Sequence, residues 1–252
     1  MVKAPQHWVF FHGFMGSQWE FAHLAMTLPG QTTCVTLVGH GDHPATDPAA
    51  YNMWTQTETW ARWLREQPAP VTLVGYSMGG RLALGLALRY PEFVQHLVLE
   101  SSSPGLASVA AQAQRQAHDQ ALAQQLLANG LPAFAQAWAR LPLFASQQRL
   151  PLTQQHRIQQ QRQQHKPVGL VNSLRYFGTG QQPNLWPALP YLTVPTTLIV
   201  GALDPKFQQI SQQMAALLPQ AKRFVVPAAG HNVHLEQPAA YQAILEAQTG
   251  WN

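Results

Sequence analysis

The chain has 252 residues, 46% of them hydrophobic, and a formal net charge of +4. This length is sufficient for one domain with a sizeable core, so we expect a single domain over residues 1–252. Cys34 is the only cysteine, which excludes an internal disulfide and favours a cytoplasmic protein. No apolar run reaches the roughly 18 residues that a transmembrane helix needs. These properties predict a soluble protein without membrane insertion, and we expect a monomer.

Short apolar runs alternate with helical patterns along the first hundred residues. The expected strands are Trp8–Phe11, Cys34–Val38, Val71–Gly75 and His96–Glu100, and the expected helices are Trp54–Leu64 and Met78–Tyr90. Each of these helices stops before a proline, which cannot continue a helix. Such alternation predicts right-handed crossovers and a mostly parallel sheet with helices on both faces.

The alternation breaks at about residue 105 and resumes after about residue 187. The intervening segment is rich in Gln, Ala and Arg and has no convincing strand, which predicts an inserted helical cap over about residues 105–187. Its Gln-rich stretch at residues 154–166 is expected to form a surface helix. The elements expected after the cap are strand Thr196–Val200, helix Phe207–Leu217, strand Arg223–Val226 and helix Gln237–Ala247.

A G-x-S-x-G motif spans residues 75–79, with Ser77 at its centre. In this motif the serine occupies a strained turn between a strand and a helix, and small neighbours permit close backbone approach. The pentapeptide alone is a weak signal, and a chance turn serine is the alternative. Here the strand-like VTLV precedes it and the helical RLALGLALRY follows it. The context predicts an α/β-hydrolase fold with Ser77 in the nucleophile position.

A serine in this turn requires an acid and a base later in the chain, each just past a strand end. Asp204 follows TTLIVGAL, and His231 follows FVVPAAG. Taken singly, Asp204 is equally well a helix N-cap and His231 a surface histidine. Together with Ser77 they predict a catalytic triad, in which His231 accepts the serine proton and Asp204 orients the imidazole.

An oxyanion hole requires two main-chain N–H donors near the serine. In this fold the residue after the nucleophile supplies one donor, here Met78, and the loop after the first strand supplies the other. We expect Phe14 to be the second donor, with Gly13 allowing the loop to pass close by. Packing at the pocket wall is the alternative role of Phe14.

The positive charge is concentrated in the expected cap. Between Gly105 and Pro187 a single acid, Asp119, faces seven basic residues: Arg115, Arg140, Arg149, Arg157, Arg162, Lys166 and Arg175. The excess of basic over acidic residues in this segment is larger than the net charge of the whole chain, so the rest of the chain is slightly acidic. A solvated helical surface is one explanation, and attraction of an anionic ligand is the other. Arg81 is mildly unfavourable in the first turn of its helix, which suggests a purpose for its charge.

The chain resembles the 2-succinyl-6-hydroxy-2,4-cyclohexadiene-1-carboxylate synthase family of menaquinone biosynthesis, which are lyases of the α/β-hydrolase fold. The matching stretches cover nearly the whole length: FFHGFMGS, VGYSMGGR, ESSSPGL with the following QRQ, WARLPLFAS, GALDPKF and AAGHNVHLEQP. The resemblance implies elimination of pyruvate from 2-succinyl-5-enolpyruvyl-6-hydroxy-3-cyclohexene-1-carboxylate, a tricarboxylate, without a metal or an organic cofactor.

The same resemblance implies a set of substrate-binding residues. It makes Arg81, Arg115 and Arg162 carboxylate binders and adds Tyr76 and Trp138 as further pocket residues. The planar fork of arginine suits bidentate binding of a carboxylate. The alternative for Arg115 and Arg162 is that they are exposed helix residues. The alternative for Trp138 and Tyr76 is that they are packing residues.

Three other functions compete with the lyase. A carboxylesterase or thioesterase would use the same triad through an acyl-enzyme, but would be expected to line its cap with apolar residues. A ligand receptor would have no physical reason to retain all three triad groups. Nucleic-acid binding lacks a recognisable motif, because the basic residues are dispersed. No metal-binding or nucleotide-binding motif is present in the sequence.

Overall fold

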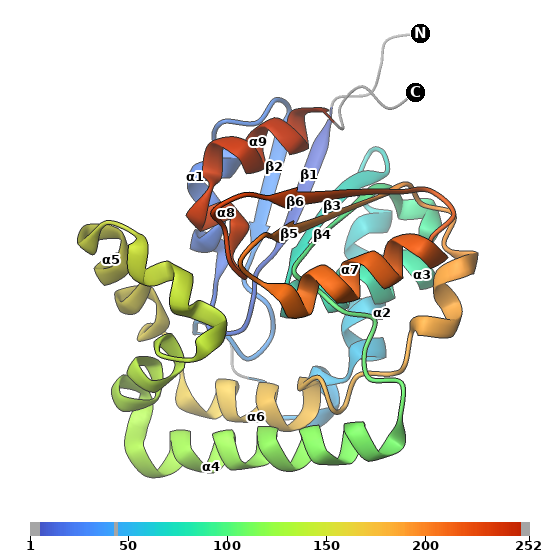
Figure 1. Ribbon diagram of the computed structural model, residues 1–252. Helices are drawn as coiled ribbons and strands as arrows, with labels where there is room; N and C mark the ends of the chain where they lie inside the picture. The colour runs from blue at the N-terminus through green and yellow to red at the C-terminus, as the bar shows by residue number, and fades with distance from the viewer. Residues whose placement is uncertain (1–5, 43–44, 248–252) are drawn as a thin grey trace, which may run out of the picture.

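A six-stranded parallel sheet forms the centre of the computed structural model, which describes residues 6–42 and 45–247 (Figure 1). The strand order is β2-β1-β3-β4-β5-β6, and every neighbouring pair is parallel. The strands are β1 His7–Phe11, β2 Gln31–Val35, β3 Val71–Tyr76, β4 Val94–Glu100, β5 Thr196–Gly201 and β6 Ala221–Val226. Since all the strands run in one direction, their carboxyl ends meet at one edge, where α/β proteins place their sites.

Helices cover both faces of the sheet. The helices are α1 Ala22–Ala25, α2 Met53–Arg65, α3 Met78–Arg89, α4 Val109–Ala139, α5 Leu152–Arg162, α6 Pro167–Phe177, α7 Pro205–Leu217, α8 Val233–Glu236 and α9 Pro238–Ala247. Short 3₁₀ helices occur at η1 Gln18–Glu20, η2 Pro48–Tyr51, η3 Pro91–Phe93, η4 Pro142–Arg149 and η5 Trp186–Tyr191. None of the helices in the described ranges combines the length and apolar character needed to cross a bilayer. The predicted α/β architecture is confirmed.

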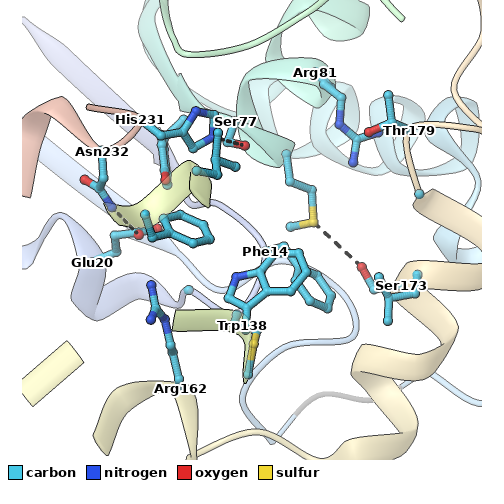
Figure 2. Close-up of a pocket in the computed structure, with 18 of the residues that line it drawn as sticks. Phe14, Glu20, Ser77, Arg81, Trp138, Arg162, Ser173, Thr179, His231 and Asn232 are labelled. Carbon is cyan, nitrogen blue, oxygen red and sulfur yellow. Dashed lines mark hydrogen bonds between the residues drawn. The ribbon is translucent and has the colours of Figure 1, made fainter. Parts of the chain in front are cut away.

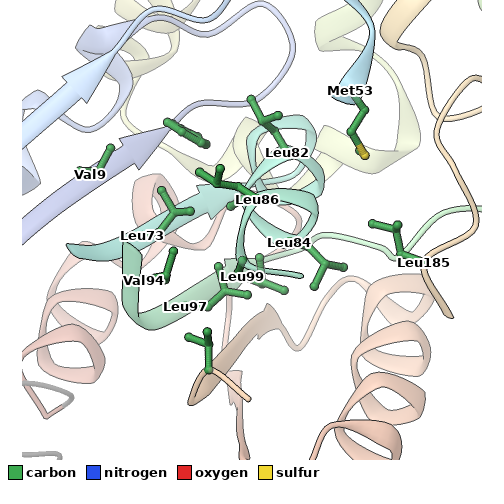
Figure 3. Close-up of a cluster of buried hydrophobic side chains, with 14 of the residues drawn as sticks. Val9, Met53, Leu73, Leu82, Leu84, Leu86, Val94, Leu97, Leu99 and Leu185 are labelled. Carbon is green, nitrogen blue, oxygen red and sulfur yellow. The ribbon is translucent and has the colours of Figure 1, made fainter. Parts of the chain in front are cut away.

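The core lies on both sides of the sheet because successive side chains of a strand point to opposite faces. On one face Leu73 of β3 packs in a cluster with Leu82 and Leu86 of α3 (Figure 3). On the other face Val74 packs in a second cluster that includes Tyr241 of α9. The apolar runs that predicted the central strands are therefore the residues that hold the two helical layers.

The second strand differs from its prediction. It spans Gln31–Val35, whereas the apolar run indicated Cys34–Val38. Its polar residues pair with β1 through their main chain, as in the register Gln31 with His7. β2 is at the edge of the sheet and partly exposed, so it tolerates polar side chains that a central strand would exclude. Leu37 is buried after the strand has ended.

The segment between β4 and β5, residues 101–195, is called the helical insertion below. It contains α4, η4, α5, α6 and η5, and no strand is found among its residues. α4 and α6 run side by side below the sheet (Figure 1) and pack through Ala123, Leu126, Leu170 and Leu174. Met15, from the loop after β1, belongs to the same cluster. The insertion therefore contacts the body of the molecule next to the carboxyl edge of the sheet.

The Gln-rich stretch forms a helix over only part of its length. α5 ends at Arg162, and residues 163–166 connect it to α6. Pro167 begins α6 and disfavours a helical conformation at the preceding residue, so Lys166 is extended, with φ −80° and ψ 122°. Ile158 and Arg162 are buried, so the helix is not wholly a surface helix.

Candidate active site

Ser77 occupies the turn that joins β3 to α3. Its backbone has φ 49° and ψ −106°, a conformation that is strained for a residue with a side chain. Its N–H donates to the carbonyl of Glu100 at the end of β4, over 2.8 Å. The first turn of α3 approaches β1 so closely that a Cβ on Gly79 would lie 2.3 Å from the Phe11 carbonyl oxygen. These contacts fix the turn so that the Ser77 side chain lies at the carboxyl edge of the sheet.

His231 lies between Ser77 and Asp204. Its Nε2 is 3.0 Å from the Ser77 Oγ, and its Nδ1 is 2.8 Å from the Asp204 Oδ2 (Figure 2 shows His231 beside Ser77). A carboxylate accepts hydrogen bonds, so Nδ1 carries a proton and Nε2 is left to accept one from the serine hydroxyl. His231 and Asp204 are both buried. This geometry permits proton transfer from Ser77 to His231.

Two neighbouring loops hold the acid and the base in place. Asp204 follows β5, and His231 follows β6. The Leu203 N–H donates to the Ala229 carbonyl over 2.8 Å, and the Asp204 Oδ1 accepts the Phe207 N–H at the start of α7 over 3.2 Å. Asp204 is therefore both the partner of His231 and a helix N-cap.

The loop after β1 carries Phe14, whose N–H is the expected second oxyanion donor. His12 fixes this loop, with its Nδ1 2.7 Å from the Gly13 carbonyl oxygen and its Nε2 2.9 Å from the Leu37 nitrogen. Because the Leu37 N–H can only donate, the His12 Nε2 accepts and Nδ1 carries the proton; burial lowers the pKa of His12 to about 3. The Gly13 carbonyl and the Phe14 N–H belong to one trans peptide and point in opposite directions, so this bond sets the direction of the donor.

A cavity at this edge of the sheet collects nine of the ten predicted site residues. They are Phe14, Tyr76, Ser77, Met78, Arg81, Arg115, Trp138, Arg162 and His231. Asp204, the tenth, lies behind His231. The Tyr76 ring packs under the loop after β1, where a Cβ on Gly13 would lie 2.5 Å from it. Burial raises the pKa of Tyr76 well above its ordinary value, so this wall of the cavity carries a neutral phenol.

Arg81 is buried on one side of the cavity, in the first turn of α3. Its guanidinium donates to the Phe177 carbonyl over 2.9 Å and to the Gln182 Oε1 over 3.4 Å, and it lies over the Phe177 ring. No acidic side chain of the described residues forms an ion pair with it. Burial, followed by the charge of Arg115, lowers the pKa of Arg81 to about 9, so it is a cation at neutral pH.

Arg162 is buried on the opposite side of the cavity (Figure 2). It donates to the Gln147 Oε1 over 3.2 Å and lies over the Phe144 ring. Within residues 6–42 and 45–247 it too forms no ion pair. Burial lowers its pKa. Two desolvated guanidinium groups without a carboxylate partner are costly, which favours an anionic ligand between them.

Arg115 differs from the other two arginines because it is paired. Its Nε lies 2.8 Å from the Asp119 Oδ1, and its side chain is 34% exposed while that of Asp119 is 3% exposed. The Asp119 Oδ2 is buried and has no hydrogen-bond partner within the described structure. Asp119 therefore neutralises part of the charge that Arg115 brings to the cavity.

Trp138 contacts three aromatic rings at the cavity wall. Its ring centroid lies 5.0 Å from that of Phe14, 5.9 Å from that of Phe134 and 6.0 Å from that of Phe144. Its indole Nε1 is buried without a hydrogen-bond partner among the described residues. Trp138 thus packs the insertion against the loop after β1 and also offers a donor to a ligand.

Most of the basic residues of the insertion do not belong to an anion-binding site. Only Arg115 and Arg162 of its seven basic residues line the cavity. The exposed ones include Arg140, Arg149 and Arg157. The charge count indicated an anionic ligand, but most of the charge is a solvated helical surface.

The sequence did not indicate several residues that line the cavity, among them Lys206, Glu20 and Asn232. Lys206 lies in the first turn of α7, where a positive charge is unfavourable, and the argument made for Arg81 would have found it. Glu20 ends η1 and Asn232 is the N-cap of α8, and the two segments meet only in the fold. Glu20 accepts the Gly13 N–H over 2.9 Å and faces the Asn232 Nδ2 over 3.5 Å (Figure 2). Burial raises the pKa of Glu20.

Comparison with known proteins gives one family and several close relatives. Residues 8–244 match the profile of the "Alpha/beta hydrolase family". A Bacillus subtilis (strain 168) protein named "Putative 2-succinyl-6-hydroxy-2,4-cyclohexadiene-1-carboxylate synthase" is 40% identical over 96% of this chain and 90% of its own length. A Serratia proteamaculans (strain 568) protein named as such a synthase is 32% identical over 96% of this chain and 93% of its own.

Solved structures agree with these relatives. The structure of MenH from S. aureus superposes with a TM-score of 0.93 at 36% identity, covering 98% of this chain and 94% of that chain. A thermophilic esterase from Thermogutta terrifontis superposes with a TM-score of 0.83 at 22% identity, covering 98% and 90%. At that identity the esterase supports the fold alone.

Proposed function

Because the chain belongs to the alpha/beta hydrolase family, we propose that it uses Ser77, His231 and Asp204 as a catalytic triad for a lyase reaction. The reaction is the elimination of pyruvate from 2-succinyl-5-enolpyruvyl-6-hydroxy-3-cyclohexene-1-carboxylate, a step of menaquinone (vitamin K2) biosynthesis. The names of the relatives at 40% and 32% identity support this assignment. The observation that carries it is that Arg81 and Arg162, both buried and without an ion pair among the described residues, line the same cavity as Ser77 and His231.

The substrate has three carboxylates, which the cationic side chains of the cavity would bind. We assign this role to Arg81, Arg162 and Arg115. Arg81 and Arg162 each retain N–H donors beyond the bonds described above, since a guanidinium has five. Tyr76 and Trp138 would complete the walls, and the buried Nε1 of Trp138 would donate to an oxygen of the substrate.

In the proposed mechanism Ser77 acts as a base. Its oxygen removes the ring proton at C2, which the adjacent succinyl ketone acidifies, while the hydroxyl proton passes to the Nε2 of His231. The electrons of the broken C–H bond move onto the ketone oxygen and give a dienolate. The N–H groups of Phe14 and Met78 would stabilise that oxygen.

Collapse of the dienolate completes the elimination. The ketone C=O re-forms, the enolate double bond and the C3–C4 ring double bond are replaced by double bonds at C2–C3 and C4–C5, and the bond between C5 and the enolpyruvyl oxygen breaks. The expelled enolpyruvate takes up a proton, which His231 supplies, and becomes pyruvate. Every step uses groups of this chain, and the scheme involves no acyl-enzyme and no cofactor.

A carboxylesterase or thioesterase is the alternative, since an acyl-enzyme would use the same triad and the same two N–H groups. The cavity argues for the lyase. An apolar ester would leave Arg81 and Arg162 desolvated without an anionic partner, whereas a tricarboxylate would pair with both.

We further propose that residues 105–187 act as a cap on a single domain, and that the protein works as a cytoplasmic monomer. Arg115, Trp138 and Arg162 of this segment all line the cavity, which supports a cap that helps to bind substrate. A single cysteine is compatible with a reducing compartment.

The proposal is tested by comparing the wild type with the Ser77→Ala variant. Pyruvate release from the succinyl-enolpyruvyl substrate is followed by coupled NADH oxidation, and substrate binding is measured by calorimetry. The expected result is loss of pyruvate release with binding largely retained. Strong residual turnover in Ser77→Ala would reject the serine as the base.

A further inference from the structure

His165 lies in the connection between α5 and α6, and its side chain is buried. Both of its ring nitrogens form hydrogen bonds with main-chain atoms of the body. The Gly41 N–H lies 2.8 Å from Nδ1, and the Met15 carbonyl oxygen lies 2.9 Å from Nε2. Since Gly41 and Met15 are far from residue 165 in sequence, this ring joins the insertion to two loops at once.

The two bonds fix the tautomer of the ring. The Gly41 N–H can only donate, so Nδ1 accepts; the Met15 carbonyl can only accept, so Nε2 carries the proton. A doubly protonated ring would place two hydrogens against each other at Nδ1. Burial lowers the pKa of His165, in agreement with a neutral ring.

Met15 is a residue that needs such support. The Gly16 N–H donates to the Gly13 carbonyl over 3.0 Å, which closes a four-residue turn from Gly13 to Gly16. Met15 has φ 61° at the third position of this turn, where a left-handed conformation favours glycine. With a side chain at that position, tertiary contacts must hold the turn, and the His165 Nε2–H supplies one to the Met15 carbonyl.

Phe14 is the residue between Gly13 and Met15, and its N–H is the proposed oxyanion donor. The imidazole of His40 packs against the Phe14 ring and also contacts two further imidazoles. His40 contacts His165 with ring centroids 5.5 Å apart, His12 at 4.9 Å and the Phe14 ring at 5.6 Å. The turn is therefore held by His12 from within the body and by His165 from the insertion.

The same connection also places a substrate-binding arginine. Arg162 ends α5 three residues before His165. Beyond the ring, the Lys166 N–H donates to the Gly41 carbonyl over 3.3 Å. At Gly169 a Cβ would lie 2.4 Å from the Gly39 carbonyl oxygen, so the start of α6 is pressed against the body. The contacts of this connection with the body therefore fix both the end of α5, where Arg162 lies, and the turn that carries Phe14.

We propose that His165 is a positioning residue that couples the helical insertion to the oxyanion hole. Its Nε2–H holds the Gly13–Gly16 turn in the conformation that presents the Phe14 N–H, and its anchorage at Gly41 holds Arg162 over the cavity. The kinetic part of this inference rests on the proposed lyase function, while the hydrogen bonds and the tautomer do not.

Two amide variants separate the two bonds. The side-chain oxygen of His165→Asn can replace Nδ1 as acceptor for Gly41 but cannot reach Met15, and the side-chain nitrogen of His165→Gln can replace Nε2 as donor to Met15. Loss of an oxyanion donor costs about 10²–10³ in kcat, so we expect a misplaced donor to lower kcat by roughly tenfold or more in His165→Asn. His165→Gln is expected to keep kcat within about threefold of the wild type.

The matched control is His156→Asn, which changes an exposed histidine of α5 and should leave kcat and KM unchanged. Circular dichroism and thermal unfolding show whether each variant is folded. A folded His165→Asn with wild-type kcat would overturn the proposal, as would a folded His165→Gln with the same loss of kcat as His165→Asn.

An independent measurement keeps the inference testable if pyruvate release is absent from the wild type. Imidazole ¹⁵N NMR of the wild type should show His165 neutral with the proton on Nε2, and the amide signals of Phe14 and Gly16 should move in His165→Asn but not in His156→Asn. A proton on Nδ1, or unmoved amide signals, would reject the coupling itself. Absent pyruvate release with these NMR results would instead reject the lyase function.

Discussion

Asp204 serves two partners with its two carboxylate oxygens. Oδ2 faces the His231 Nδ1, and Oδ1 accepts the Phe207 N–H as the N-cap of α7. The sequence is compatible with either role alone, and in the structure the residue makes both contacts. A substitution that keeps the cap while changing the group that faces His231 therefore separates stability from catalysis.

Asp204→Asn is such a substitution. Its amide oxygen can still cap α7, but its N–H₂ would face the His231 Nδ1 and favour the wrong tautomer. We expect pyruvate release to fall by about 10⁴, the loss known for the equivalent change in a serine protease triad. The free energy of unfolding should stay near the wild-type value, whereas Asp204→Ala should also lose about 1 kcal/mol with its cap. Assays of pyruvate release and urea unfolding check both, and an active Asp204→Asn would contradict the assigned role.

A substitution at Arg81 separates the effect of its positive charge from that of its planar guanidinium. Arg81→Lys keeps a positive charge but loses the planar fork, so binding of a carboxylate should weaken and KM should rise by roughly tenfold or more. Arg149→Ala is the matched control, because Arg149 is exposed and does not line the cavity. Steady-state kinetics on the tricarboxylate substrate measure the effect. An unchanged kcat/KM in Arg81→Lys would remove Arg81 from the bidentate carboxylate binders.

At the scale of elements, the parts that could be predicted are those with local signals. β1, β3 and β4 are apolar runs, and the first two end at glycine turns; all three were found close to their true bounds. β2 was placed three residues late, because its main-chain pairing at Gln31 leaves no apolar pattern. α5 was extended to residue 166, past its end at Arg162.

The candidate site follows the same rule. Ser77, Asp204 and His231 could be predicted because each follows a strand in a motif with a known order. Glu20 and Asn232 could not, because their contact joins segments that lie far apart in the sequence. The cap and the catalytic roles of these residues stay predictions.

A substitution at Gly79 tests the packing of α3, the helix that follows Ser77, against β1. Its Cβ would lie 2.3 Å from the Phe11 carbonyl, so Gly79→Ala should force α3 away from β1 and cost about 1–3 kcal/mol of unfolding free energy. Gly85→Ala is the control in the same helix, since its Cβ would meet the flexible Met53 side chain at 3.1 Å, and alanine favours a helix. Urea unfolding compares the two. Equal stability of the two variants would contradict the tight contact between α3 and β1.

At the scale of the whole molecule, burial of neutral histidines sets the response to acid. Burial lowers the pKa of five histidines: His7, His12, His40, His96 and His165. For His12 the folded-state pKa is about 3 and for His96 about 4. The unfolded chain therefore takes up more protons below about pH 6.5, and stability is lost as the pH falls from there towards the folded-state values.

We expect the free energy of unfolding to be lower at about pH 5 than at about pH 8, by about 2 kcal/mol from His12 alone. Urea unfolding at the two values measures the difference. His118→Ala, at an exposed position of α4, should leave it unchanged. Because the raised pKa of His234 acts in the opposite direction, equal stability at both pH values would show that the five buried neutral histidines do not dominate the response to acid.

The whole account depends on an elimination reaction in a cationic cavity. The most direct measurement gives one preparation of the purified protein both the succinyl-enolpyruvyl-cyclohexene carboxylate and a panel of p-nitrophenyl esters, and follows pyruvate release by coupled NADH oxidation. The account predicts rapid pyruvate release with negligible ester turnover. Fast ester hydrolysis with pyruvate release no faster than the spontaneous background would contradict it and make the same triad that of a hydrolase.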